Sequence, residues 1–433
     1  MNWTRKAAMG GTLLVATTFG LTDATAQQGS KVIELRSARE LKGRVVAGEE
    51  VRELIGNVHF VQQQESGGLV YVWCDRALRY MSQNKMELFG HVRVVRDSVT
   101  VISDEGVYYA DARRVEVHTG VRLERGGSVL TARNGIEFVD EKRFFFSVNV
   151  RLVDSASTVT SDTMTYLENE AESIAVGNVV AVNTANATTV FGDSLTHYDR
   201  LKFTVVLKKP RLMDIDTTSD GGVDTMVVVS KRMEMFQDTS QTFVAIDSVL
   251  MARGDLSARC GRATYLRRDG VIVLQYLPVV WHAENQISGD SIAIHLSDRR
   301  LRDVYVRGRA MAISRADSVL KNRFDQLTGR ELTMYFAFGK IDHIDVERNA
   351  TSLYYLFDNI TPNGANKSSG DRIAIEFLLG KIDRIKVVGG VQGQYFPENM
   401  LAKREPDYNL DGFRWYATRP VRDGSRIVTV EHD

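Results

Sequence analysis

The chain has 433 residues, with 55 Lys and Arg against 55 Asp and Glu, so its formal net charge at pH 7 is zero. This balance produces no global field that would attract nucleic acid or an anionic surface, and two cysteines are too few for a disulfide framework. The low count of six prolines is typical of closely spaced strands, whose hydrogen-bond ladders proline would interrupt.

Residues 1–26 have the pattern of a secretory signal peptide. Arg5 and Lys6 precede an uncharged stretch from Ala7 to Thr22, and Ala24-Thr25-Ala26 has the small-x-small form of a cleavage site. The stretch is too short, and too rich in Gly and Thr, to span a bilayer as an anchor. We therefore predict an exported chain whose mature form begins near Gln27.

A repeat of 29 residues follows, counted from Asp75, Asp104, Arg133 and Asp162. Within each unit, large apolar residues stand two apart with polar residues between them, which is the period of a strand with one buried face. β-Branched residues dominate and no helical stripe is present. Polar breaks at matching offsets indicate turns, so each unit is predicted to hold two or three short strands.

The apolar columns of the repeat are predicted to face one interior, whereas Arg93, Arg122 and Arg151 between them are predicted to face water. We expect an all-β fold, an elongated antiparallel stack built from repeats. The inward residues are Val58, Phe60, Val92, Val94, Val121, Leu123, Phe144, Phe146, Val150, Leu152 and Val179.

Beyond Asp193 the repeat continues with less regularity. We predict β-repeats over 27–210, a continued or second β-stack over 225–393, and a short irregular C-terminal tail over 394–433 that packs on or extends the stack. Polar insertions at 217–224 and 314–328 and a polar stretch at 361–370 are interpreted as loops. Cys74 and Cys260 fall in one column several rungs apart, which predicts two packed thiols without a disulfide.

Signals for catalysis are weak. The histidines form no zinc-binding spacing, and no nucleophile elbow, phosphate loop or dinucleotide fingerprint occurs. Asp75, Asp104 and Asp162 form a column that could suggest calcium, but Arg133 interrupts it, and turn residues are the simpler interpretation. We expect no enzyme activity, no metal, no cofactor and no nucleic-acid partner. A carbohydrate-active β-helix enzyme is the weakest alternative, because the carboxylate column is broken.

The interior itself allows two interpretations from the residues alone. In a closed solenoid, the apolar columns are core, and the chain is a structural or adhesive β-protein without a lipid cargo. In an open stack of two sheets, the same columns line a trough suited to acyl chains.

Several motifs recur in a fixed order: Gly56-Asn57-Val58-His59-Phe60, Cys74-Asp75-Arg76-Ala77-Leu78-Arg79-Tyr80, Leu88-Phe89-Gly90-His91-Val92, Ser161-Asp162-Thr163-Met164-Thr165-Tyr166 and Val176-Gly177-Asn178-Val179. This series resembles the OstA-like (organic solvent tolerance) repeat of periplasmic lipopolysaccharide-transport proteins, clearly over residues 45–210 and more faintly to about 400.

The resemblance implies a β-jellyroll, or folded taco, whose interior holds the acyl chains of lipopolysaccharide or another acylated lipid. It also implies a periplasmic location, with association with the outer membrane as an option. Open strand edges would join other β-jellyroll proteins of the transport bridge, or a second copy head to tail. The eleven inward residues named above would then form the lipid trough. The chain departs from the small bridge protein in its greater length, its insertions and its own C-terminal ending.

Overall fold

The computed structural model of the protein describes residues 33–63, 68–183, 187–217, 222–297, 300–317, 319–378 and 381–431. The predicted signal peptide lies outside these residues. Within them, no helix has both the length and the apolar character needed to cross a membrane.

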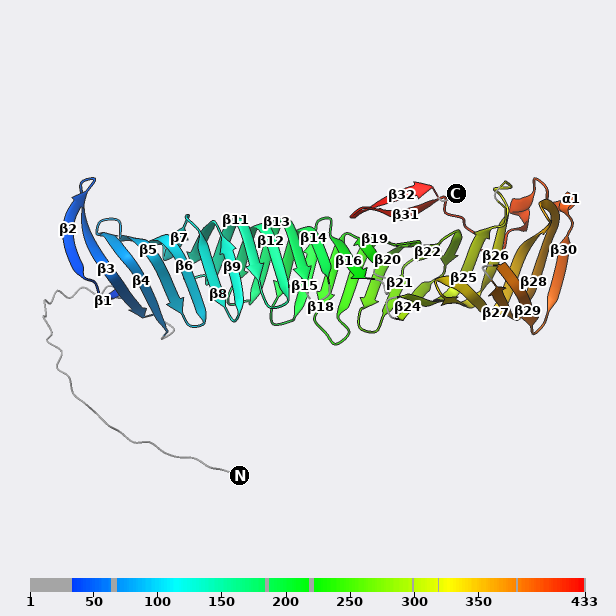
Figure 1. Ribbon diagram of the computed structural model, residues 1–433, viewed down its shortest axis with the longest axis horizontal. Coiled ribbons are helices and arrows are strands. Elements are labelled where there is room, and N and C mark those ends of the chain that lie inside the picture. The colour runs from blue at the N-terminus through cyan, green and yellow to red at the C-terminus, as the bar shows by residue number, and fades with distance from the viewer. Residues whose placement is uncertain are drawn as a thin grey trace, which may run out of the picture.

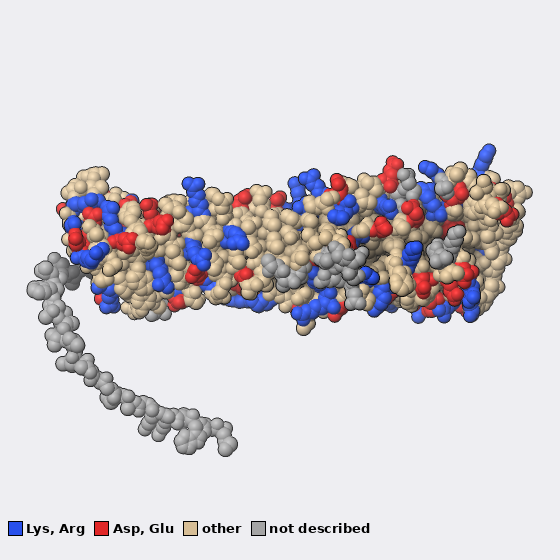
Figure 2. Space-filling model, in the orientation of Figure 1, with Lys and Arg blue, Asp and Glu red and all other residues tan. Residues whose placement is uncertain are grey.

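Among the described residues, thirty strands form one antiparallel sheet, which runs from β1 (Ile33–Ser37) at one end of an elongated molecule to β30 (Gln392–Phe396) near the other (Figure 1). The predicted all-β, repeat-built stack is therefore confirmed, and both predicted repeat regions lie in the same sheet. Lys, Arg, Asp and Glu are mixed along the face seen in Figure 2, in keeping with the zero net charge.

Strands of eleven to fifteen residues are interspersed with short ones of four to seven residues in the regular repeat and its continuation. In chain order they are β2 (Glu40–Val46), β3 (Glu49–Gln63), β4 (Leu69–Tyr80), β5 (Lys85–Arg96), β6 (Val99–Tyr109), β7 (Arg114–Val117), β8 (Val121–Arg125), β9 (Ser128–Ala132), β10 (Asn134–Phe138), β11 (Arg143–Val153), β12 (Ser157–Leu167), β13 (Glu172–Asn183), β14 (Thr188–Tyr198), β15 (Phe203–Leu207), β16 (Arg211–Thr217), β17 (Val223–Val229) and β18 (Arg232–Phe236).

The remaining strands of the sheet complete the stack. They are β19 (Thr242–Arg253), β20 (Leu256–Leu266), β21 (Val271–Gln275), β22 (Val279–His282), β23 (Asn285–Ser288), β24 (Ser291–Ser297), β25 (Arg300–Arg315), β26 (Phe324–Ala337), β27 (Lys340–Asp358), β28 (Thr361–Leu378) and β29 (Lys381–Val388).

Many of these strands bend in the middle, and the bend folds the sheet lengthwise. In β5, the pairing with β6 shifts register between Phe89 and Val92, and the two residues between them have positive φ. The bend separates two half-sheets that face each other. We call the half that carries Val92–Arg96 and its paired segments half-sheet A, the half that carries Lys85–Phe89 half-sheet B, and the bend the fold line.

The recurring glycine and aspartate motifs build this fold line. Gly90 and Gly177 have φ of +72° and +80°, and a Cβ at either position would clash with the carboxylate of Asp75 or Asp162 on the neighbouring strand. The residue after each glycine bonds to the same carboxylate: His91 Nδ1 lies 2.7 Å from Asp75, and Asn178 Nδ2 donates to Asp162 at 2.9 Å. These aspartates therefore lie within strands and do not form the predicted turns.

Inward-facing side chains of the two half-sheets pack into two main clusters. A small one at the N-terminal end includes Val58, Phe60 and Val92, and a large one extends from Val117 to Ile375. Arg93, Arg122 and Arg151 are exposed, as predicted. Both cysteines are free and buried inward, and burial raises the pKa of each thiol to about 12.

One predicted loop is instead strand, and a second is shorter than predicted. Residues 361–370 form the first part of β28, which pairs with β27 on one side and β30 on the other. The predicted insertion at 314–328 overlaps the end of β25 and the start of β26 at its two ends, so the loop between these strands is shorter than predicted. The polar composition of 361–370 suggested a loop, but a strand whose backbone is paired on both sides tolerates polar side chains on its exposed face.

The C-terminal tail contains more regular structure than predicted: a short helix α1 (Glu398–Leu401), a 3₁₀ turn η1 (Glu405–Tyr408) and a hairpin of β31 (Thr418–Asp423) with β32 (Arg426–Glu431). It turns back over the stack, and its hairpin packs against β17, β19 and β20 (Figure 1).

The tail covers the outer face of half-sheet A. Val280 of β22 belongs to the inner cluster, so its neighbour Trp281 faces outward, where its ring meets Tyr416 of the tail. The fully buried Gln286 donates to the carbonyl of Arg414 and accepts from the backbone of Tyr416.

Candidate functional site

A cavity of about 1040 Å³ lies between the half-sheets in the middle of the molecule, among segments from β8 to β20. Half-sheet A contributes β8, β9, β11, β12, β13, β14 and β16 in succession, which are six strand spacings. At about 4.8 Å per spacing, this side extends roughly 29 Å. The bends of the strands close one side of this groove, and the strand ends leave the other side open as its mouth.

The floor of the groove is apolar. Three predicted residues, Leu123, Phe146 and Leu152, line it. Further apolar lining residues come from both half-sheets, and several of them lie beyond the regular repeat. They include Leu130, Val159, Met164, Tyr166, Ala175, Ala181, Val190, Leu195, Leu212, Met235, Phe236, Phe243 and Tyr265.

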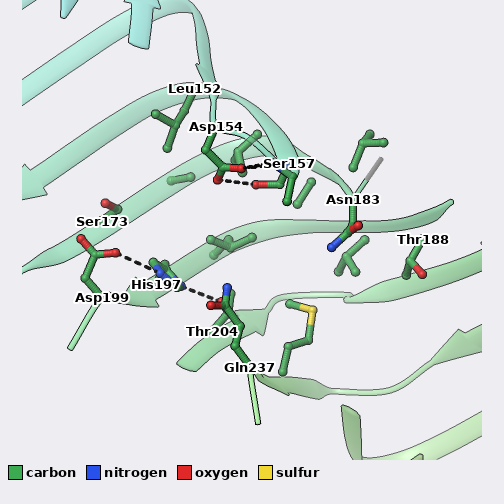
Figure 3. Close-up of a pocket in the computed structure, with 18 of the residues that line it drawn as sticks. Leu152, Asp154, Ser157, Ser173, Asn183, Thr188, His197, Asp199, Thr204 and Gln237 are labelled. Carbon is green, nitrogen blue, oxygen red and sulfur yellow. Dashed lines mark hydrogen bonds and ion pairs between the residues drawn. The ribbon is translucent and has the colours of Figure 1, made fainter. Parts of the chain in front are cut away.

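The mouth of the groove is polar. On half-sheet A, the Asp154 carboxylate accepts hydrogen bonds from the backbone of Ala156 and Ser157 and from the Ser157 hydroxyl, each at 2.7 Å (Figure 3). Burial acts to raise the pKa of Asp154, but these hydrogen bonds outweigh it and the pKa is lowered. The carboxylate therefore stays charged beside the apolar floor.

The opposite rim carries a second polar group, centred on His197 of half-sheet B. Its Nδ1 lies 2.8 Å from the Thr204 hydroxyl, and its Nε2 lies 3.2 Å from Asp199 (Figure 3). Gln237 and Asn183 also line the cavity at its rim. An apolar floor below a hydrogen-bonding rim suits an amphipathic ligand with its tail inside and its polar part outside.

An ion cluster crosses the mouth at the N-terminal end of the groove. Arg96 ends β5 on half-sheet A, and its guanidinium donates to Glu137 and to Glu168, which belong to the half-sheet B side, at 2.8 Å each. Arg96 is 8% exposed, and its guanidinium lies 5.5 Å from the centre of the Phe144 ring. Burial raises the pKa of Glu137, while Arg96 acts in the opposite direction.

A second polar bridge crosses the mouth at the C-terminal end. Arg267, which follows β20 on half-sheet B, donates to the Thr188 hydroxyl at 2.6 Å and to Asp214 at 3.0 Å, both on half-sheet A. Asp214 is buried. Beyond this bridge the two half-sheets close on each other, because inner residues such as Leu274, Ile292 and Ile294 have no exposed surface.

A separate cavity of about 100 Å³ lies on the N-terminal side of Arg96. Three other predicted residues, Phe60, Val94 and Phe144, line it together with Val70, Val72, Met86, Leu88, Val99, Val101, Tyr108, Val115 and Val139. Arg96 and Glu137 form part of its wall.

The five remaining predicted residues line neither cavity: Val58, Val92, Val121, Val150 and Val179. Each follows a residue of positive φ at the fold line, and all are at most 5% exposed. The half-sheets are closest there, so these side chains meet as core. Residues two positions further on, such as Val94 and Leu152, lie where the half-sheets diverge and leave space.

No group of His, Cys, Asp and Glu suited to hold a metal ion is found among the residues that the structure describes. The site is therefore defined by shape and polarity: an elongated antiparallel β-jellyroll with an apolar groove under a polar rim. Residues 30–189 match the family model described as OstA-like protein, which confirms the resemblance over that stretch. No curated protein matches the chain. The groove extends past the matched region to Arg268.

Proposed function

We propose that the protein is a periplasmic, non-catalytic carrier that holds the acyl chains of lipopolysaccharide in the groove and helps to bridge the transport of this lipid to the outer membrane. The single observation that carries the proposal is the apolar floor beneath the hydrogen-bonding rim. Each methylene group that leaves water for such a floor contributes about 0.8 kcal/mol. The match of residues 30–189 to the OstA-like family supports the choice of this lipid class.

Strand edges at the two ends of the stack support the bridging part of the proposal. β2 pairs with β3 on one side, and Leu41 and Val45 on it are 63% and 69% exposed. At the other end, Ile385 and Val388 of β29 are also exposed. Such edges can add strands of another β-jellyroll protein or of a second copy, head to tail.

A structural or adhesive protein with a closed core is the second candidate. The fully buried inner residues from β21 onward favour it for the C-terminal half. It gives no role to the polar-rimmed groove of the first half, so we prefer the carrier.

Photo-crosslinking in cells tests the proposal with a matched pair of aromatic positions. p-Benzoylphenylalanine replaces Phe146, which lines the groove, or its neighbour Phe145, which faces outward by strand alternation. We expect lipopolysaccharide to be captured from position 146 and not from position 145. Equal capture at both positions, or capture of protein alone from position 146, would overturn the carrier function.

A further inference from the structure

The two bridges that cross the mouth give the groove defined ends. Arg96 links half-sheet A to Glu137 and Glu168 of the half-sheet B side, and Arg267 makes the equivalent link to Asp214 from half-sheet B. The cavity of about 1040 Å³ lies between them, and the closed core lies beyond the second one. The two bridges thus close the groove at both of its ends along the long axis of the molecule.

The wall at the N-terminal end is thick. Phe144 lies beneath the Arg96 guanidinium, and the guanidinium of Arg125 lies 5.1 Å from the centre of the Tyr166 ring, again joining half-sheet A to half-sheet B. Phe60, Met86 and Leu88 of the N-terminal cavity belong to the small core cluster, whereas the buried apolar residues of the groove belong to the large one. An acyl chain that moved along the stack would have to displace the buried Arg96 guanidinium from two half-buried carboxylates.

We propose that the groove is a compartment, in which an acylated lipid enters and leaves sideways through the mouth and does not slide along the stack past Arg96. This inference rests on the proposed carrier function and adds the route of the lipid. It predicts that the small N-terminal cavity stays free of groove-bound lipid while the Arg96 cluster is intact.

The energetic basis is the cost of opening the bridge. Removing one partner of a buried ion pair leaves a charge that is neither solvated nor paired. Three charged groups meet in the Arg96 cluster, so passage of an apolar chain would leave two carboxylates without their cation. Entry through the mouth meets only the polar rim, where water already solvates the exposed groups.

The test uses the purified full chain and a defined hexa-acylated lipid A as the probe. p-Benzoylphenylalanine is placed at Phe146 in the groove, at Phe60 in the N-terminal cavity, or at the outward-facing Phe145 as the background control. In the otherwise unchanged protein, we expect crosslinking at position 146 to exceed the control at least tenfold, with position 60 at the control level. In Arg96→Met, we expect crosslinking at position 60 to rise at least fivefold.

The outcomes separate the two proposals. Absence of crosslinking at position 146 overturns the carrier function itself. Strong crosslinking at both 146 and 60 in the unchanged protein leaves the carrier function standing and overturns the compartment. If Arg96→Met folds but position 60 stays at background, the Arg96 cluster is not the barrier. Should Arg96→Met fail to fold, Glu168→Gln weakens the same cluster and takes its place. The comparison of positions 146 and 60 in the unchanged protein still decides whether the groove is a compartment.

Discussion

Arg96 and Glu168 are 72 residues apart in the sequence, and their side chains meet at 2.8 Å across the mouth of the groove. Arg96 ends β5, whereas Glu168 follows β12, so a strand end on half-sheet A faces a strand end several rungs further along half-sheet B. Arg267 after β20 and Asp214 on β16 repeat this offset at the other end of the groove. The two half-sheets are therefore staggered along the stack.

The depth of a side chain in the fold should decide whether a charge is tolerated. Val150 is 1% exposed beside the fold line, whereas Leu152 lines the groove. We expect Val150→Glu to unfold the protein, because an unpaired buried carboxylate costs several kcal/mol. Leu152→Glu should leave the melting temperature within a few degrees and abolish lipid A binding. Circular dichroism melts and a binding assay on both variants check this, and equal unfolding by the two would contradict an open groove.

The glycines of the fold line should be intolerant of a side chain. Gly177→Ala forces Ala to φ near +80° and pushes its Cβ into the Asp162 carboxylate, so we expect a loss of about 1–3 kcal/mol in unfolding free energy. Removing the opposing carboxylate with Asp162→Ala should recover part of that loss in the double variant. Gly43→Ala in β2 is the control, because nothing lies near its added Cβ. Urea titration gives the unfolding free energies of the unchanged protein, Gly177→Ala, the double variant and Gly43→Ala.

Asp325 should make stability depend on pH. Burial raises its pKa to about 7, partly opposed by the hydrogen bond from the backbone of Tyr355. Because the folded pKa lies above the unfolded one, the stabilising contribution is fully present below about pH 4 and is lost as the pH rises towards 7. Asp325→Asn should therefore raise stability at pH 8, by up to about 4 kcal/mol, and change it little at pH 4. The exposed Asp383→Asn variant keeps Asp325, so its thermal melts should follow the same pH dependence as those of the unchanged protein.

The buried Arg323 of the stack, which binds two carboxylates of the tail, should be the strongest link between tail and stack. Arg323 is 2% exposed, donates to both oxygens of Glu398 at 2.9 and 2.5 Å, and lies 3.4 Å from Glu405. Arg323→Ala leaves these carboxylates without their cation and should cost about 3–5 kcal/mol. Limited proteolysis should then release the tail first, whereas Arg404→Ala, whose partner is an exposed aspartate, should behave like the unchanged protein.

The two thiols should be inert in the folded protein. Cys74 and Cys260 are buried, and their raised pKa of about 12 leaves almost no thiolate at neutral pH. Iodoacetamide should label neither residue under native conditions and both in urea, as mass spectrometry would show. Rapid native labelling of either cysteine would mean that the local packing opens.

The sequence predicts the fold well where its period is regular, because a 29-residue interval identifies inward positions strand by strand. It does not predict how deep each inward residue lies, so Val150 and Leu152 received the same role although one is core and the other lines the groove. It also missed Arg96, whose neighbours Asp97-Ser98 form a turn. Contacts across the mouth join residues 41 to 79 positions apart, a relationship that no repeat of 29 residues reveals.

The stagger of the half-sheets also has a consequence for how the chain acquires its structure. Neighbouring strands pair over short sequence distances, so the ladder can grow one hairpin at a time as the chain emerges at its N-terminal end. Glu137 and Glu168, whose carboxylates bind Arg96, are in contrast synthesised 41 and 72 residues after it. The N-terminal end of the groove can therefore close only after several further strands have formed. A nascent or truncated stack would lack these ion pairs and would expose an apolar surface to which chaperones can bind.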